Sequence, residues 1–201
     1  MSSSIDEEND NINENIIKNI QMSSQENILL LSLEKFYKTN NTSKKIIPIV
    51  RGESIISMRL IDYFVTNYAK NNRVNYTITE NNTKINFNVY SSYKAQLKAF
   101  NKKYFDPFSR GNRIPFFFDD DCLITTIGQL NFFKWYLSKN VNKYIIDNYK
   151  EIDLDLIKNK KKKSKNKDKV KKKTINNVEK APTIIKKTIV KKINSIQVSF
   201  D

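Results

Sequence analysis

Histidine is absent from this 201-residue chain, and Cys122 is its single cysteine. Together these scarcities exclude an intrachain disulfide, the usual Cys/His zinc sites and the nucleophilic triads that depend on histidine. They also favour a reducing, intracellular setting, and they make Cys122 a small buried residue rather than a nucleophile. With no catalytic signature in the sequence, we expect a protein that is not an enzyme and that uses no cofactor or metal.

Long apolar runs are missing too. No segment of the sequence approaches the roughly 20 apolar residues that a membrane-spanning helix needs. The amino end, MSSSIDEENDNIN, is acidic and lacks the basic-then-apolar order of a secretion signal. We therefore expect neither secretion nor a membrane partner.

Positive charge, by contrast, is abundant and uneven. The net charge is +15, from 36 basic and 21 acidic residues. Residues 1–43 carry 3 basic and 7 acidic groups, residues 44–157 carry 17 and 11, and residues 158–201 carry 16 and 3. These shifts predict three parts: an acidic, mostly disordered arm with a short helix (1–43), a globular domain (44–157) and a Lys-rich disordered tail (158–201).

A polybasic segment beside a folded domain suits a polyanion, because each neutralised phosphate releases condensed counterions. Nucleic acid is the interpretation that we favour. The alternatives are that the lysines keep the protein soluble or act as a nuclear-import-like signal, or that they bind an anionic membrane or an acidic protein.

The first half of the domain shows apolar patterns of both periods. IIPIV (46–50) predicts a strand that Pro48 confines to a sheet edge, and Ser54 can cap a helix that runs to Ala69. Alternating apolar residues in 74–79 and 84–90 flank a polar break and predict a β-hairpin. Upstream, Ile28–Tyr37 is expected to be a short helix docked on the domain or on a partner.

The segment from Ser91 to Phe118 carries the candidate site. A helix capped by Ser91 or Ser92 places four apolar side chains within an arc of roughly 60°, with a row of lysines about 130° away. The apolar set is Tyr93, Leu97, Phe100 and Tyr104. Asp106-Pro107 ends the helix, and a basic loop with Arg110, Gly111 and Arg113 follows. The candidate phosphate-binding residues of the domain are Lys94, Lys98, Lys102, Lys103, Arg110 and Arg113.

Beyond the loop, Ile114–Phe118 is expected to be a buried strand next to the hairpin. Asp119, Asp120 and Asp121 suggest a solvated turn, with a magnesium-dependent nuclease or phosphotransferase as a remote alternative. Thr126 and Gln129 have the spacing of a capping box for a helix to Leu137. A second helix, Asn140 to Tyr149, makes either a helical hairpin that closes the core or a helix-turn-helix DNA reader; the hairpin is our default.

The tail from Lys158 is too polar to fold alone. Its contribution to binding is diffuse attraction from two lysine runs, Lys160, Lys161, Lys162 and Lys163, and Lys171, Lys172 and Lys173. The final segment, 184–200, regains apolar residues, so it either orders on a partner or remains solvated.

Three strings resemble a family of small proteins of nucleocytoplasmic large DNA viruses, the giant viruses, some of which carry a late-transcription-factor label. They are SMRLIDYFVTNYAK (57–70), NVYSSYKAQLKAFNKKYFDPFSR (88–110) and TTIGQLNFFKW (125–135). The resemblance covers residues 46–150 and implies a role in transcription. Poxvirus late transcription factors grouped with such proteins bind zinc through cysteines, and Cys122 alone makes no tetrahedral zinc site.

Residues and resemblance together predict an α+β domain in which three or four helices pack a small antiparallel sheet. The predicted function is a late-gene-type viral transcription factor that binds nucleic acid, DNA being favoured over RNA. Viral RNA polymerase or another transcription factor is a further partner, and the host cytoplasm, virus factory or virion is the expected location. The alternative is a structural or scaffold protein that binds the genome non-specifically.

Overall fold

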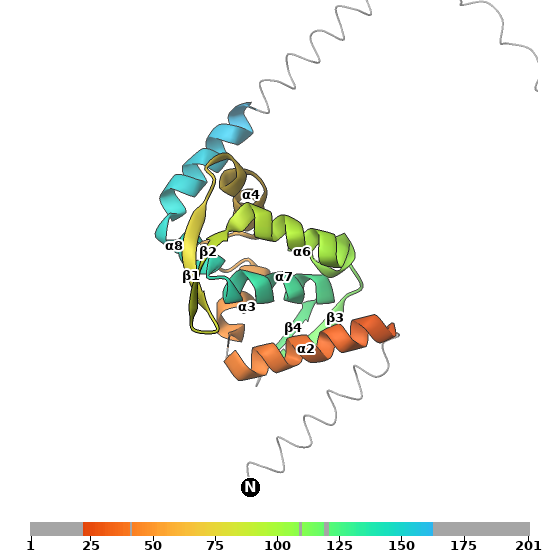
Figure 1. Cartoon of the computed structure of the whole chain (residues 1–201). Helices are drawn as coiled ribbons and strands as arrows, with labels where there is room; N and C mark the ends of the chain where they lie inside the picture. The colour runs from red at the N-terminus through yellow and green to blue at the C-terminus, as the bar shows by residue number, and fades with distance from the viewer. Residues whose placement is uncertain (1–21, 41, 109, 119–120, 163–201) are drawn as a thin grey trace, which may run out of the picture. The chain divides into compact units, whose positions relative to one another are not determined.

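The computed structural model describes residues 22–40, 42–108, 110–118 and 121–162 (Figure 1). The predicted α+β class is confirmed, because the chain combines helices with two antiparallel two-stranded sheets. The chain divides into two compact units, residues 1–158 and 159–201. Everything below concerns the first unit unless stated, and the expectations for 1–21 and 163–201 lie outside the described residues.

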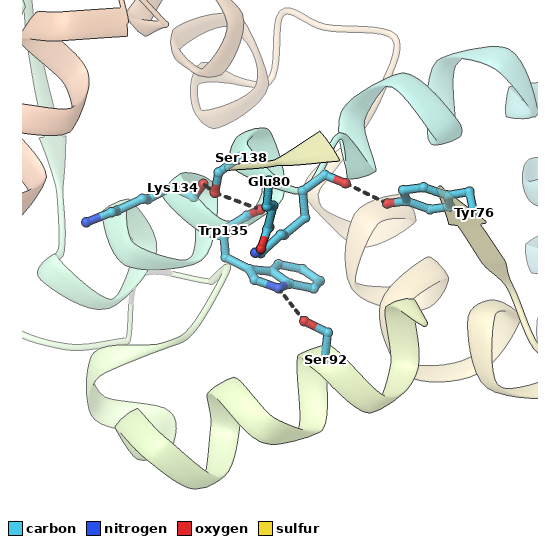
Figure 2. Close-up of polar contacts among 7 residues, drawn as sticks. Tyr76, Glu80, Ser92, Lys134, Trp135 and Ser138 are labelled. Atoms are coloured by element: carbon cyan, nitrogen blue, oxygen red, sulfur yellow. Dashed lines mark hydrogen bonds and ion pairs between the residues drawn. The ribbon is translucent and has the colours of Figure 1, made fainter. Parts of the chain in front are cut away.

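Helix α7 (Ile127–Ser138) is the centre of the core. Every side chain from Ile127 to Leu137 is buried except Lys134, which is half-buried. The predicted capping box is present, since the Thr126 hydroxyl accepts the Gln129 N–H at 3.1 Å. In Figure 1, α7 runs between α2 (Ser24–Asn40) and α6 (Val89–Tyr104). The Trp135 indole N–H donates to Ser92 Oγ of α6 at 3.0 Å (Figure 2), and Tyr37 of α2 donates to the Leu130 carbonyl at 2.7 Å.

Helix α2 is longer than the Ile28–Tyr37 expectation. Ser23 and Glu26 form a reciprocal cap: the Ser23 N–H and hydroxyl both donate to Glu26, and the Glu26 N–H donates back to Ser23 Oγ. Leu30, Leu33 and Tyr37 are buried on one face, so the helix docks on the domain.

Helix α3 (Ser43–Arg51) contradicts the predicted strand at 46–50. Ile46, Ile47 and Ile49 are buried together on one helical face, whereas Lys44 and Lys45 are exposed. Pro48 lacks an N–H and removes one helical hydrogen bond, but burial of the isoleucine face prevails in so short a helix. Gly52, in the left-handed region with φ 80°, ends the helix as its C-cap.

The predicted helix from Ser54 to Ala69 begins later and is irregular. Ser57, not Ser54, caps α4 (Met58–Tyr63) by accepting the Leu60 N–H at 3.2 Å. A π-helical turn, η1 (Phe64–Tyr68), follows and leads into α5 (Ala69–Asn71). The side chains of Leu60, Ile61, Phe64, Val65 and Tyr68 in this irregular helical stretch are buried.

The predicted hairpin is confirmed as β1 (Asn75–Glu80) paired with β2 (Thr83–Asn88). Asn81 and Asn82 at the turn both have positive φ, 47° and 62°, as a type I′ turn requires. Tyr76 donates to the Lys139 carbonyl at 2.9 Å, and the Lys139 amine is ion-paired with Glu80, so the hairpin is fastened to the end of α7 (Figure 2).

Strand β3 (Ile114–Phe118) exists as predicted, but its partner is β4 (Asp121–Thr125) and not the hairpin. Two adjacent segments form this pair because Leu123 and Thr125 bury the same face as the alternate residues of β3. Tyr37 of α2 packs edge-on against Phe116 and Phe118 at 5.6 and 5.7 Å between ring centroids.

Helix α8 (Val141–Asp147) packs on α7, with Val141 and Ile145 buried. After Asn148 the chain is helical over 149–162, past the expected end at Tyr149 and the predicted domain limit at 157. Tyr63 and Tyr68 donate to Asp155 at 2.6 Å and to Glu151 at 2.8 Å, which fixes this helix to α4 and η1.

Candidate nucleic-acid interface

The outer face of α6 is the surface on which the predicted lysines lie. Asn88, rather than Ser91 or Ser92, caps this helix by accepting the Ser91 N–H at 2.7 Å. Tyr93 is buried against the core, while Lys94 and Lys98 are exposed one turn apart on the opposite side. The exposed residues beside them are small: Ser91, Ala95 and Ala99. A bulky anion can therefore approach the two amines closely.

The lysine row is interrupted before Lys102. Asn101 has φ 50° and ψ −177°, which breaks the helix, and its side-chain oxygen accepts the Lys103 N–H at 2.8 Å. Lys102 is exposed but no longer continues the helical spacing of Lys94 and Lys98. The single unbroken row predicted from a regular helix is therefore wrong at its last member.

Lys103 and Arg110 each form an ion pair with a carboxylate. Lys103 Nζ lies 3.0 Å from Glu26 of α2 and 4.8 Å from the centre of the Tyr104 ring. Hydrogen bonds from the Ser23 main chain and from Lys103 lower the pKa of Glu26 to about 2. Arg110 Nε lies 3.3 Å from Asp106 Oδ2. Both cations are exposed to solvent, and each also stabilises the fold through its ion pair.

The other predicted cations of the domain keep their charge available. Lys94, Lys98, Lys102 and Arg113 are exposed and form no ion pair with another described residue. Lys160, Lys161 and Lys162 are exposed at the end of the 149–162 helix. Lys163, Lys171, Lys172 and Lys173 lie outside the described residues.

Lys70, which was not among the predicted site residues, also lies at this surface. Its amine lies 5.7 Å from the centre of the Tyr90 ring, one turn before Lys94. The contact places a cation of α5 beside the start of α6. The sequence signal for this contact was Tyr90, an aromatic residue one helical turn before Lys94. Its partner Lys70 is 20 positions away in the chain, so local spacing did not reveal the pair.

Acidic residues are scarce in the same stretch of the sequence. Residues 81–105 contain no aspartate or glutamate, and Asp106 is the sole acidic residue between 81 and 118. Asp106 is buried and paired with Arg110. The exposed surface built from this stretch is therefore rich in positive charge, and carboxylates from other elements reach it at Lys103, which pairs with Glu26, and near Arg110, which interacts with Asp62.

Among the aspartates after β3, the one that the structure describes, Asp121, is held in an ion pair. Asp121 pairs with Arg51 at 2.7 Å, and that arginine lowers the pKa of its carboxyl. Asp119 and Asp120 are not described. No group of three or more potential ligands that could hold a metal occurs within the described ranges.

The packing bears on two further expectations. Cys122 is exposed on β4, so the prediction that it is buried is wrong: in the alternation of this strand, Leu123 and Thr125 face inward. Helices α7 and α8 agree with the helical hairpin that was our default. The first is buried along its length, and the second is only seven residues long.

The geometry defines a small α+β protein with a basic face on helix α6, a helix that itself contains no acidic residue. The family model described as "Family of unknown function (DUF7197)" matches residues 7–200, and the chain belongs to that family. The match extends into both terminal segments, whereas the resemblance noted from the sequence covers residues 46–150.

Among curated proteins, the chain is similar to "Uncharacterized protein L507" of Acanthamoeba polyphaga mimivirus, a giant virus, with 35% identity over 130 residues. The aligned part is 61% of this chain and 50% of the relative, so the chain spans about half the length of that protein. This relative supports the predicted giant-virus origin. No solved structure gives a significant match. Within the described residues, no helix is both long and apolar enough to cross a membrane.

Proposed function

We propose that the protein binds nucleic acid through the outer face of α6, using phosphate contacts and no enzymatic chemistry. The observation that carries this proposal is the pair Lys94 and Lys98, which are exposed among small side chains in a stretch of sequence, 81–105, that contains no aspartate or glutamate. Lys70, Lys102 and Arg113 extend the charge to either side. Contacts of this kind position a protein on a polyanion without reading its sequence.

The biological role that we propose is an accessory factor in viral transcription. Support comes from the family resemblance of residues 46–150 and from the giant-virus relative. DNA is the favoured polyanion, and viral RNA polymerase or another transcription factor is the proposed protein partner. The host cytoplasm, the virus factory or the virion is the proposed location.

A structural or scaffold protein of the virion or virus factory is the second candidate. Ile28 and Leu31, three positions apart on α2, are 70% and 64% exposed and fit a protein contact. In this version the Lys-rich tail binds the genome and α6 has no special part.

Salt-dependent binding of a labelled DNA duplex tests the proposal. If about six phosphates are engaged, log affinity falls with log salt at a slope near −5, about −0.9 per phosphate. In the full chain, Lys94→Gln with Lys98→Gln should weaken binding and reduce that slope by about 2. Glutamine keeps the helix propensity, so the change isolates the charge.

The matched control is Lys35→Gln with Lys38→Gln, two exposed lysines of α2, which packs on the other side of α7. It should leave the slope within error of the parent. An α6 pair that changes nothing would refute this interface. Replacing Lys171, Lys172 and Lys173 by glutamine then separates the candidates: loss of all binding from this change alone favours the scaffold with a generic arm.

A further inference from the structure

Phe108 is an aromatic side chain that the core does not use. It is 37% exposed, whereas all other described aromatic residues are buried or half-buried. It lies in the loop after α6, between Lys102 and Arg113 in sequence. A phenyl ring left in water beside cations is available to a ligand that has both a flat apolar face and negative charge.

The loop that carries Phe108 is fixed to the first turn of α7. The Asp106 N–H donates to the Gly128 carbonyl at 3.1 Å, and the Gln129 side-chain amide donates to the Pro107 carbonyl at 2.7 Å. The Phe108 N–H donates to Asp106 Oδ1 at 3.3 Å, in an Asx turn. Because this backbone is already ordered, binding at the ring loses little conformational entropy.

Arg110 gives the ring a cationic neighbour. The centre of its guanidinium lies 5.4 Å from the centre of the Phe108 ring, and its Nε is paired with Asp106. An aromatic ring with a guanidinium beside it is a surface on which a nucleobase can stack.

We propose that Phe108 and Arg110 form a stacking platform for an unpaired nucleobase of a single strand whose phosphates contact the α6 lysines. This inference rests on the proposed nucleic-acid binding and makes it more specific. Bases inside a duplex are already stacked on each other, so the platform adds affinity for single-stranded segments and not for intact duplex.

A comparison of two strands of equal length tests the platform in the full chain. Oligothymidylate offers bases and phosphates, whereas an abasic oligomer offers phosphates alone. The parent protein should bind oligothymidylate about tenfold more tightly, the scale of one stacked base. Phe108→Ala should abolish this difference and leave abasic affinity unchanged, and Phe108→Leu should do the same while keeping an apolar side chain.

Phe108→Trp supplies a direct signal. Trp135 is buried at 4% exposure, so quenching that appears only in this variant reports a base at position 108. Oligothymidylate should quench it and the abasic strand should not. Equal binding of both strands by the parent would overturn the platform alone, and it is the result expected if Phe108 instead contacts a protein. An equal loss of affinity for both strands in Phe108→Ala would also overturn the platform alone. Failure of the parent to bind either strand would overturn the proposed function as well.

Discussion

Gly128 shows how a single missing side chain allows the candidate loop to sit where it does. A Cβ built on Gly128 would lie 2.7 Å from the Lys103 carbonyl oxygen, a main-chain atom that cannot rotate away. The close approach seats the end of α6 and the Asp106 turn on the first turn of α7. Glycine is needed here for space, not for an unusual φ angle.

Gly128→Ala should therefore lower the free energy of unfolding by about 1–3 kcal/mol, the range for overpacking a tight contact. Urea denaturation of the full chain measures the change. Gly111→Ala is the matched control, because its Cβ would meet the same carbonyl at an ordinary 3.8 Å. We expect the control to stay within about 0.5 kcal/mol of the parent. Equal stability of both variants would contradict this packing.

At the scale of elements, local signals predicted those elements whose partners are adjacent in sequence. Alternation and an Asn-rich turn sufficed for the β1–β2 hairpin, and the Thr126–Gln129 spacing sufficed for the start of α7. The run at 46–50 failed because five apolar residues fit either period, and only the isoleucine face buried in the folded domain decides for α3. The partner of β3 was missed because register depends on which faces are buried together.

Helix α2 depends on an element-to-element contact that sequence patterns do not reveal. Glu26 caps its own helix and binds Lys103 at the far end of α6, 77 positions away in sequence. Its folded-state pKa of about 2 lies below the ordinary 4.5. The unfolded chain therefore binds more protons between these values, and stability rises with pH across that window.

Glu26→Gln should remove this dependence and keep the helix cap, because glutamine also fits a capping box. The variant should be less stable than the parent at neutral pH, and its unfolding free energy should vary less between about pH 2 and 4.5. Urea denaturation at several pH values in that window measures both. Glu53→Gln, at an exposed position, is the control. A variant whose profile parallels that of the parent would show that Glu26 is not the group that titrates.

For the whole molecule, the sequence showed where the positive charge lies but not which cations are paired with carboxylates. Helical spacing identified Lys94 and Lys98 correctly as an exposed pair. The same spacing could not show that Asn101 breaks the row, or that Glu26 and Asp106 occupy Lys103 and Arg110. Those contacts depend on tertiary structure, which brings carboxylates from other elements to particular cations.

Missing histidine has a consequence for the molecule as a whole. Histidine is the side chain whose unperturbed pKa lies in the physiological range, so this surface should keep its charge throughout that range. Although Cys122 is exposed, desolvation by neighbouring protein atoms and the nearby Asp121 raise the pKa of its thiol above the ordinary 9.0, further from neutrality. Burial also raises the pKa of Asp62, which interacts with Arg110.

Affinity for a labelled DNA duplex should therefore change less than about twofold between about pH 5.5 and 7.5 at fixed salt, while it falls steeply with salt at fixed pH. Fluorescence anisotropy in buffers of matched ionic strength measures both responses. Asp62→Asn tests Asp62, a carboxyl near Arg110 whose pKa is raised. If the affinity of the parent changes with pH and that of the variant does not, the change is assigned to Asp62. A strong pH response in both proteins would mean that binding depends on a titrating group and not on the permanent charge of lysine and arginine.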